Sequence, residues 1–478
     1  MNDWEPKQKR YPHFDAPLSK LEMRRIATRP DAVASHQFLP FLRFTDEWQP
    51  FRGKSGRPRA RPARKVRVIR YASRRDAAVF SYYRWFLATH YEDKLARAGL
   101  GGSVLAYRRL PAPAGGGKSN IHFAHETFEA IRGFDSCVVV ALDISQFFES
   151  LDHARLEHVW AGLLGRTSLP PDHQHVFRNI TRYADVDRDE AYVRYGHARW
   201  EVTATGRRLK ITSKRIPVQL GSMEDFRRKI AGKGCSWPKL IERHTDPHGI
   251  PQGAPLSDLL ANLYLFDFDI DIQDYVLARG GVYFRYSDDI LIVLPGSQTT
   301  EADAAEVFAR DRISAYGPAL QIKAAKTSAY VYWRAGGAHR YRHLKGKAPH
   351  GLEYLGFRFD GLYAHIRPST LSRLHRNMTL GARAAARAHV ARYPGKPLAE
   401  LLEKFNIADF MQKFGRVRDF SQASDPQDWT FWTYVCRAKK IFGPMGRPLD
   451  RQLSRYRAFV WRSIEAEIAR AYRDQAKP

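Results

Sequence analysis

The sequence contains little cysteine, and its cysteines form no metal or disulfide pattern. There are three among 478 residues, they lie far apart, and no CxxC pair occurs; they are Cys137, Cys235 and Cys436. An odd number of widely spaced cysteines argues against a disulfide framework and against a cysteine zinc site. A reducing compartment suits such a chain, so we expect a cytoplasmic protein.

Long apolar runs are also lacking. The first residues, MNDWEPKQKRYPHFD, contain no apolar signal core, and no stretch approaches the ~18 uninterrupted apolar residues of a membrane span. We therefore expect a soluble protein that does not associate with membrane. Hydrophobic residues at 44% and aromatic residues at 13% are sufficient for buried cores, and the length predicts two to four packed subdomains.

Acidic residues are scarce relative to basic ones. Lys and Arg total 78 against 50 Asp and Glu, which results in a net charge of +28 and a pI near 10.0. Such a surface attracts polyanions, so nucleic acid is the expected partner. A basic protein of no special affinity, or one that rests on anionic membrane, is the alternative at this point.

The N-terminal part of the chain predicts an extension followed by a strand and a helix. Residues 1–50 mix aromatic and charged residues without a clear period and are interpreted as an N-terminal extension wrapped on the body. Residues 52–75 open with a Gly/Pro/Arg loop and then turn apolar, as a basic loop entering a strand would. Residues 76–98 carry apolar residues at helical spacing, and Gly99 ends that helix.

The middle and the end of the chain are less regular. An interval at about residues 165–245 is polar and basic, includes GRRLKITSKRIP, and predicts helices followed by some strand, with a possible insertion. Apolar spacing predicts helices at residues 257–278 and 302–316. Beyond about residue 369 the chain is mainly helical and basic.

Acidic residues stand at the ends of two apolar runs. Residues 138–142, VVVAL, form a continuous apolar run typical of a strand buried on both faces, and the run ends at Asp143. The segment VYFRYSDDILIVLP predicts two short strands joined at a tight turn that carries Ser287, Asp288 and Asp289. Three carboxylates are thus expected at strand ends.

Adjacent aspartates between apolar strands require a compensating cation. Like charges repel at this distance, and partial burial removes their water. Magnesium prefers hard oxygen ligands, so the predicted metal site comprises Asp143, Ile144, Asp288 and Asp289, with manganese as a substitute. Two ions about 3.5–4 Å apart would activate a 3′-hydroxyl and stabilise a leaving pyrophosphate. Taken alone, an Asp-Asp pair is more often a solvated turn.

The order of the surrounding motifs resembles the reverse transcriptase family. ALDISQFFESLDH is similar to motif A, with Asp143 as metal ligand, and GIPQGAPLS is similar to the P-Q-G loop of motif B. Tyr286, Ser287, Asp288 and Asp289 match the Y-x-D-D box of motif C. Lys326-Thr327 and EYLGFRF resemble motifs D and E, and RVIRYASRRD and AYRR resemble the fingers.

This resemblance spans roughly residues 64–360 and implies the fold. It implies an α+β right-hand polymerase, in which an antiparallel sheet flanked by helices forms the palm. Residues 51–365 would form fingers and palm, and residues 366–478 a basic helical thumb or thumb-like domain. In that tail, cations beside aromatic residues suit a groove that follows a nucleic-acid backbone, or they form a solvated basic face.

The resemblance also implies roles for single residues in binding the nucleotide. Phe148 would close the space beside the sugar 2′ position, so dNTPs are the expected substrates. Gln252 and Gly253 would approach the nucleotide, and Lys326 would protonate the leaving pyrophosphate. Cations of the fingers that could bind the triphosphate are Arg67, Arg74, Arg75 and Arg108, with Lys118. Each of these side chains also has an interpretation without a ligand. Phe148 would then be a core residue, and the cations would be solvated surface charges.

Residues that would bind nucleic acid include Lys118, Tyr286, Gly356, Arg373 and Arg376. A further acidic series, Asp267, Asp269 and Asp271, is interpreted as structural, because i, i+2 spacing scatters carboxylates around a helix.

Within the family the chain is most similar to the bacterial defence-associated enzymes. We expect neither group II intron features nor an RNase H domain, and the VTG sequence of retron thumbs does not occur. The placement implies an antiphage role, with DNA made on a dedicated noncoding RNA, or without a template, or alongside a second polymerase subunit or a second copy of the chain. Protein-primed synthesis from one of 23 tyrosines and an idle RNA-binding scaffold remain alternatives.

Overall fold

The computed structural model describes residues 4–48, 65–203, 206–234, 237–346, 349–414 and 430–475. The following statements concern these residues. Most of the Gly/Pro/Arg loop expected at residues 52–75 lies outside them, as does Cys235.

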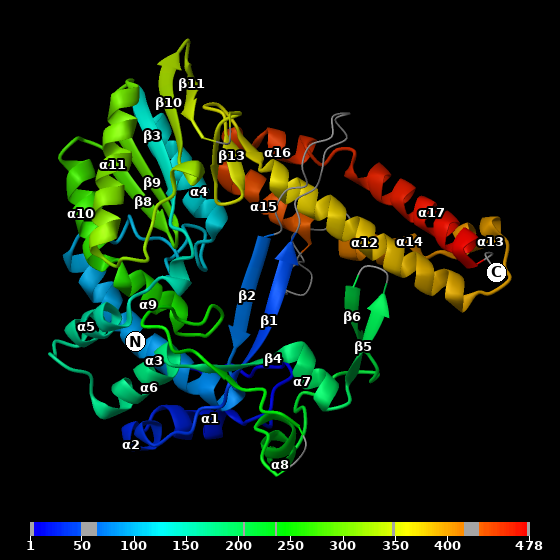
Figure 1. Cartoon of the computed structure of the whole chain (residues 1–478). Coiled ribbons are helices and arrows are strands. Elements are labelled where there is room, and N and C mark those ends of the chain that lie inside the picture. The colour runs from blue at the N-terminus through cyan, green and yellow to red at the C-terminus, as the bar shows by residue number, and fades with distance from the viewer. Residues whose placement is uncertain are drawn as a thin grey trace. The chain divides into compact units, whose positions relative to one another are not determined.

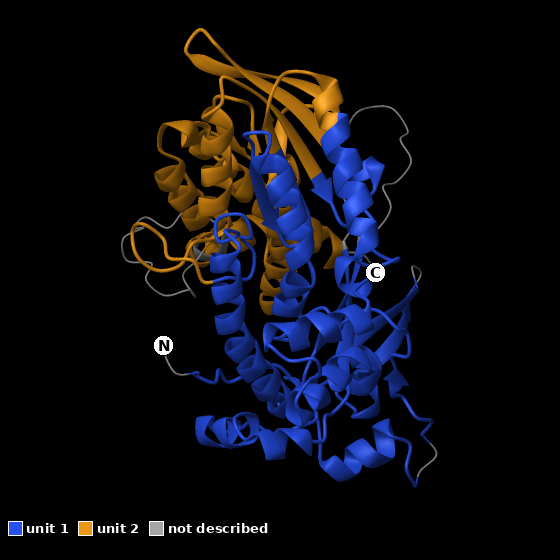
Figure 2. Cartoon of the chain, turned by 90° about the vertical axis from the view of Figure 1, so that its left-hand side faces the viewer, with its two compact units in different colours: residues 1–108, 142–292, 303–327 blue, residues 109–141, 293–302, 328–478 orange. Residues whose placement is uncertain are grey.

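The chain forms two compact units, each assembled from three separate stretches (Figure 2). Unit 1 contains Met1–Arg108, Leu142–Ile292 and Asp303–Thr327. Unit 2 contains Arg109–Ala141, Val293–Ala302 and Ser328–Pro478. The limits of these units do not coincide with the linear boundaries expected at residues 50 and 365.

The N-terminal segment of unit 1 is part of a sheet. Helices α1 (Lys20–Ala27) and α2 (Pro30–Ala34) precede strand β1 (Phe41–Trp48), which pairs antiparallel with β2 (Lys65–Tyr71) and parallel with β4 (Ala184–Asp187). With β7 (Glu242–Arg243) the strand order is β2-β1-β4-β7. Residues 41–48 thus form a strand, which the irregular sequence pattern of residues 1–50 did not predict.

Helix α3 (Arg74–Arg97) confirms the helix expected at residues 76–98. Ser73 caps it by accepting a hydrogen bond from the backbone N–H of Asp76, which satisfies one of the free amides of the first turn. Tyr83, Leu87 and Tyr91 lie on its buried side, as their spacing predicts.

A five-stranded sheet carries the strand ends of interest. Its order is β11-β10-β3-β9-β8, and β3 (Ser136–Asp143) pairs antiparallel with β10 (Ser328–Ala335). Val138, Val139 and Val140 are all buried, so the strand is covered on both faces, as a continuous apolar run predicts. Strands β8 (Val282–Tyr286) and β9 (Asp289–Pro295) flank the expected turn, and β11 spans Ala338–Lys345.

Helices complete unit 1, and two of them replace one expected helix (Figure 1). The segment expected as a single helix at residues 257–278 forms α9 (Ser257–Tyr264) and α10 (Phe266–Leu277), because Leu265 leaves the helical conformation. The remaining elements are α5 (His153–Leu163), α6 (Pro171–Thr181), α7 (Arg188–Arg194), β5 (Ala198–Thr203), β6 (Gly206–Ile211), α8 (Met223–Asp225) and α11 (Thr299–Ala315). The first four residues of α11 belong to unit 2.

Unit 2 contains a small sheet and a group of helices. The strands β12 (Leu352–Tyr354), β13 (Phe357–Phe359) and β14 (Ala364–Ile366) form the sheet, and Phe359 stacks on Phe128 of α4 (Asn120–Arg132) with ring centroids 4.8 Å apart. The C-terminal helices are α12 (Pro368–Arg392), α13 (Leu398–Lys404), α14 (Ile407–Phe414), α15 (Phe431–Phe442), α16 (Pro448–Arg451) and α17 (Tyr456–Gln475).

Helices α12 and α17 pack along their buried stripes. Met378, Ala382 and Ala386 recur every fourth residue on α12, and Ile464 and Ile468 do so on α17. Small alanines let two helices approach closely, so the pair is stable although its outer faces are basic. The α+β class with antiparallel sheets and a helical C-terminal region is confirmed. Among the described residues no helix is long and apolar enough to cross a membrane.

Candidate active site

The carboxylates of two segments meet where β3 ends. The backbone N–H of Ile144 donates to the carbonyl of Asp288 at 3.0 Å, and the N–H of Ser145 donates to the carbonyl of Gln321 at 2.9 Å. The first bond holds the end of β3 against the β8–β9 turn, and the second ties it to the segment before β10. Asp143 and Asp288 are 145 positions apart in the sequence, and both lie in unit 1.

The β8–β9 turn is strained at Ser287. Its φ is +61°, in the left-handed region that β-carbon-bearing residues rarely adopt. The hydroxyls of Ser287 and Tyr107 lie 3.0 Å apart and share a hydrogen bond, and Tyr107 itself has a φ of +64°. Two strained residues therefore support each other at the turn that presents Asp288.

The pKa of Asp288 is raised above its usual range. Burial is the main cause, and the negative charge of Asp143 raises it further, while Lys326 and Arg67 act in the opposite direction. The Nζ of Lys326 donates a hydrogen bond to Asp143 Oδ1. Two carboxylates that repel each other beside a lysine that neutralises one of them form an environment that favours a cation.

These donors fit a hard divalent ion such as magnesium. Asp143 and Asp288 supply carboxylate oxygens, and Mg²⁺ needs only one or two protein carboxylates when substrate phosphates complete its shell. In the described part of the chain, no group of three or more His, Cys, Asp or Glu is arranged to hold a metal. The negative charge of Asp289 acts on Tyr286, whose pKa is raised by burial and then by Asp289.

The glycine loop expected to approach a nucleotide is tied to β2. The backbone N–H of Arg70 donates to the carbonyl of Gln252 at 2.8 Å. Gly253 has a φ of +112°, and a Cβ there would lie 2.6 Å from the Arg70 carbonyl oxygen, so no other residue fits without a shift. The loop is thus positioned by its backbone.

Phe148 lies beside the same loop. Its carbonyl accepts a hydrogen bond from the N–H of Ile250 at 2.8 Å, and its ring is partly buried. This bond joins the segment that follows Asp143 to the segment that contains Gln252.

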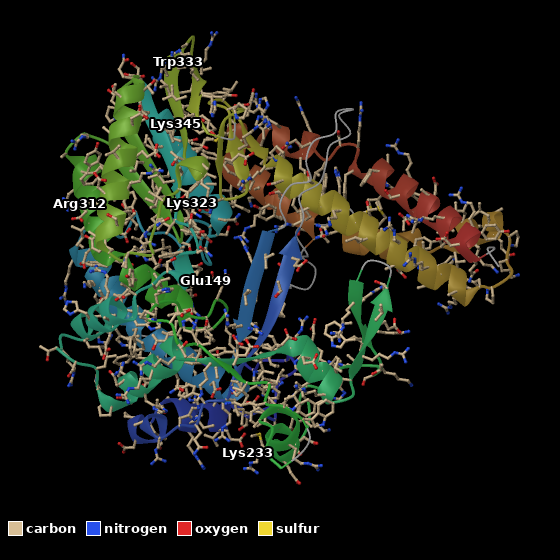
Figure 3. All side chains as sticks on the ribbon, in the orientation of Figure 1. Glu149, Lys233, Arg312, Lys323, Trp333 and Lys345 are labelled. Carbon is tan, nitrogen blue, oxygen red and sulfur yellow. The ribbon has the colours of Figure 1, made fainter. Side chains whose placement is uncertain are left out.

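A cavity of about 370 Å³ opens at this junction within unit 1. Its walls include Gln146, Glu149, Tyr183 and His244, and Glu149 is labelled in Figure 3. The rings of Tyr183 and His244 stack with centroids 4.6 Å apart, and the Arg70 guanidinium lies 5.0 Å from the Tyr183 centroid. One part of the cavity wall therefore consists of packed rings and a guanidinium.

The structure separates the expected triphosphate-binding cations into two groups. Arg67 on β2 is exposed and acts electrostatically on Asp288. Arg74 and Arg108 are not available: Arg74 is 3% exposed and donates to the carbonyls of Tyr11, Asp15 and Val218. The expectation that Arg74 binds a nucleotide is therefore wrong, because its donors already hold the N-terminal segment.

Arg108 is engaged in the same way. Its Nη2 donates to Glu92 Oε2 at 2.6 Å, and its Nη1 donates to the carbonyls of Gly101 and Val104. Since its side chain is almost fully buried, it braces the end of α3, and the expectation of triphosphate binding is corrected here too. Arg75 is exposed on α3.

Four expected nucleic-acid contacts belong to unit 2, whereas Asp143 and Asp288 belong to unit 1. Lys118 forms an ion pair with Glu126 at 2.6 Å. Gly356 has a φ of +92° after Leu355, whose carbonyl accepts a hydrogen bond from Asn120. The other two are Arg373 and Arg376, on the outer side of α12, where Arg373 is exposed. Tyr286, the fifth, precedes the turn in unit 1.

Sequence reasoning missed a buried arginine that supports the turn. Arg285 is fully buried; its Nε and Nη2 donate to the two carboxylate oxygens of Asp269 at 2.6 and 2.5 Å, and its Nη1 donates to Ser287 O at 3.2 Å and Asn262 Oδ1 at 3.0 Å. Burial alone would lower the pKa of Arg285, but Asp269 raises it, so the guanidinium stays charged.

Asp269 is thereby structural, as expected for its series. Tyr283 also donates to its Oδ1, at 2.7 Å. An acidic residue on an otherwise apolar helix face, together with an arginine inside an apolar strand, was the available signal for this pair.

Comparisons with known proteins match part of the chain to a known family. The family model described as reverse transcriptase (RNA-dependent DNA polymerase) matches residues 219–359, which include Gln252 and Asp288 but not Asp143. A curated relative, the retron Ec86 reverse transcriptase of Escherichia coli, is 49% identical over 43 residues, 9% of this chain and 13% of the relative.

Solved structures of telomerase show a distant likeness. Telomerase from Candida albicans in complex with the TWJ fragment of telomeric RNA has a TM-score of 0.35 at 10% identity, covering 93% of this chain and 60% of that chain. Apo telomerase from Candida tropicalis has a TM-score of 0.34 at 11% identity, covering 89% and 65%. The chain thus spans less than two thirds of the length of each of these proteins.

Of the two carboxylates, Asp288 at the β8–β9 turn lies inside the matched segment, and Asp143 at the end of β3 lies outside it. Residues 219–359 of the chain are similar to the reverse transcriptase family.

Proposed function

We propose that the chain is an RNA-directed DNA polymerase that adds dNTPs to a 3′-hydroxyl by two-metal phosphoryl transfer. The observation that carries the proposal is the approach of Asp143 and Asp288, which the Ile144–Asp288 backbone bond holds together beside Lys326. When bound, Mg²⁺ supplies charge stabilisation for the attacking and leaving oxygens.

Protein side chains have distinct tasks in this proposal. Asp143 and Asp288 hold the ions, and Arg67 approaches the triphosphate from β2. The Nζ of Lys326, which donates to Asp143 Oδ1 in this structure, would supply the proton to the leaving pyrophosphate. Phe148 closes the sugar site against a 2′-hydroxyl.

Primer extension tests the proposal. Purified protein with Mg²⁺, a primed RNA template and labelled dNTPs should extend the primer, and Asp288→Ala should abolish extension. Asp135→Ala is the matched control, since Asp135 is 92% exposed and pairs only loosely with Arg334 at 3.6 Å. Equal extension by wild type and Asp288→Ala would reject the assignment of the carboxylates.

The proposed biological role is antiphage defence. The similarity of the RYASRRDAAVF and AYRR segments to defence-associated enzymes and the short match to a retron reverse transcriptase support it. Phage should form fewer plaques on bacteria that express the wild-type chain together with the DNA flanking its gene than on bacteria that express the Asp288→Ala variant in the same way. Plating that is equal for both strains across a diverse phage panel would contradict this role, and sequencing nucleic acid that co-purifies with the protein would identify template and product.

A further inference from the structure

The basic segment GRRLKITSKRIP, which the catalytic proposal does not use, belongs to a β-hairpin that stands apart as its own sheet. Strands β5 and β6 pair antiparallel with each other, and Figure 1 shows them as a separate ribbon beyond α7. The register places Arg199 opposite Lys210 and Glu201 opposite Arg208 on one face. Because side chains alternate along a strand, Trp200, Val202 and Leu209 lie on the other face.

The base of the hairpin is firmly anchored in unit 1. Ala198 is buried in a cluster with Phe14 and Leu220, and Leu209 packs against that cluster. The indole N–H of Trp200 donates to Glu190 Oε2 at 3.0 Å. The ribbon is therefore a fixed element and holds its charged face in one orientation.

Positive charge is concentrated on the first face. Arg199 and Lys210 lie directly opposite each other, so their like charges repel. Glu201 reduces this repulsion, because its carboxylate lies 3.0 Å from Arg199 and 2.8 Å from Lys210. Arg208 is exposed beside them. From residue 198 to 215 the sequence holds six basic residues, also counting Arg207, Lys214 and Arg215, and Glu201 is the one acidic residue.

We propose that the face formed by Arg199, Arg208 and Lys210 binds the phosphate backbone of double-stranded RNA outside the catalytic centre. Guanidinium and ammonium groups recognise phosphate oxygens without reading bases. Unstacked bases need open aromatic platforms, but Trp200, the aromatic residue of this ribbon, lies on the other face, bonded to Glu190 and covered by the Arg207 guanidinium at 4.9 Å.

An anionic membrane is a weaker match for this surface. The exposed apolar side chains of the ribbon are single ones, Val202 and Ile211, and such side chains do not bury enough area to anchor a protein to lipid. The RNA assignment deepens the proposed function, since it names a second contact for the template RNA.

Charge removal on the ribbon tests the inference. The variant Arg208→Gln/Lys210→Gln leaves the anchor residues intact, and Arg24→Gln/Arg25→Gln removes two exposed arginines from α1 as a matched control. Binding of a blunt 20-base-pair RNA duplex, measured by fluorescence anisotropy over a salt series, should weaken about tenfold in the ribbon variant, with a salt slope lower by about 1 to 2. Thermal melting should show both variants folded.

Each result has a defined meaning. Unchanged duplex affinity, equal loss in the α1 control, or stronger loss of binding to anionic phosphatidylserine vesicles than to RNA overturns the inference. Extension of a short, pre-annealed primer at saturating concentration should stay within about twofold of wild type. If wild type extends no primer but the ribbon variant still loses duplex binding, the catalytic proposal fails and the RNA surface stands.

Discussion

Asp288 occupies a position where its negative charge is unfavourable in the folded chain. Its pKa is raised by burial and by Asp143, so the ionised carboxylate is less stable in the fold than in the unfolded chain. Below the unfolded pKa, near 4, the group is protonated in both states and the penalty is absent; the penalty is complete above the folded pKa. A bound cation would remove it.

Asp288→Asn should therefore stabilise the metal-free protein at neutral pH. The expected rise in unfolding temperature is on the order of 2 °C at pH 7 and disappears below about pH 4. Mg²⁺ should raise the unfolding temperature of wild type and leave the variant unchanged. Differential scanning fluorimetry at several pH values, with and without Mg²⁺, measures both, and a variant less stable than wild type at pH 7 would contradict the electrostatic account.

Phe148 permits a second test at the scale of one residue. Phe148→Val opens the space beside the sugar, so discrimination between dGTP and GTP should fall by about 10- to 100-fold. The ratio of kcat/KM values in primer extension measures it. Phe86→Val, at a partly buried position of α3, is the control. Unchanged discrimination by Phe148→Val would show that the Phe148 ring does not select the sugar.

At the scale of elements, the β8–β9 hairpin depends on one buried ion pair. Arg285 connects Asp269 of α10 to the carbonyl of Ser287, so the helix fixes the turn that presents Asp288. Both charges lose their hydration on burial, and each is stabilised by the other. Removing one partner would leave the other as an unpaired buried charge.

Arg285→Met should destabilise the fold by about 3–5 kcal/mol, because it leaves Asp269 buried without a counter-charge. Arg334→Met is the control, since that arginine is exposed and its ion pair contributes less than about 1 kcal/mol. Urea unfolding followed by tryptophan fluorescence compares them. Similar losses for the two variants would show that Arg285 is not the support of the turn.

At the scale of the whole molecule, the net charge of +28 should govern the proposed association with nucleic acid. With six or more phosphate contacts, affinity for RNA should fall by at least about 10³-fold between 50 and 200 mM salt. Filter binding with the Asp288→Asn protein measures this salt dependence of RNA affinity, because the variant binds RNA without synthesising DNA. A flat salt profile would contradict a backbone-dominated interface.

Local pattern and motif order were sufficient for much of this protein. The apolar run before Asp143, the turn at Ser287 and the helix after Ser73 follow from residues near in sequence, so their strands and helix were predictable. The order of the motifs placed Asp143 and Asp288 in one site, and the structure brings these two together. The α+β class followed from the same elements.

The tertiary structure alone decided which charged residues are available. Arg67 and Arg74 look alike in the sequence, yet one is exposed near Asp288 and the other is used by carbonyls 59 to 144 positions away. A buried side chain such as Arg74, whose donors are all used by internal carbonyls, is not available to a ligand, and those partners come from segments that only the folded chain brings together.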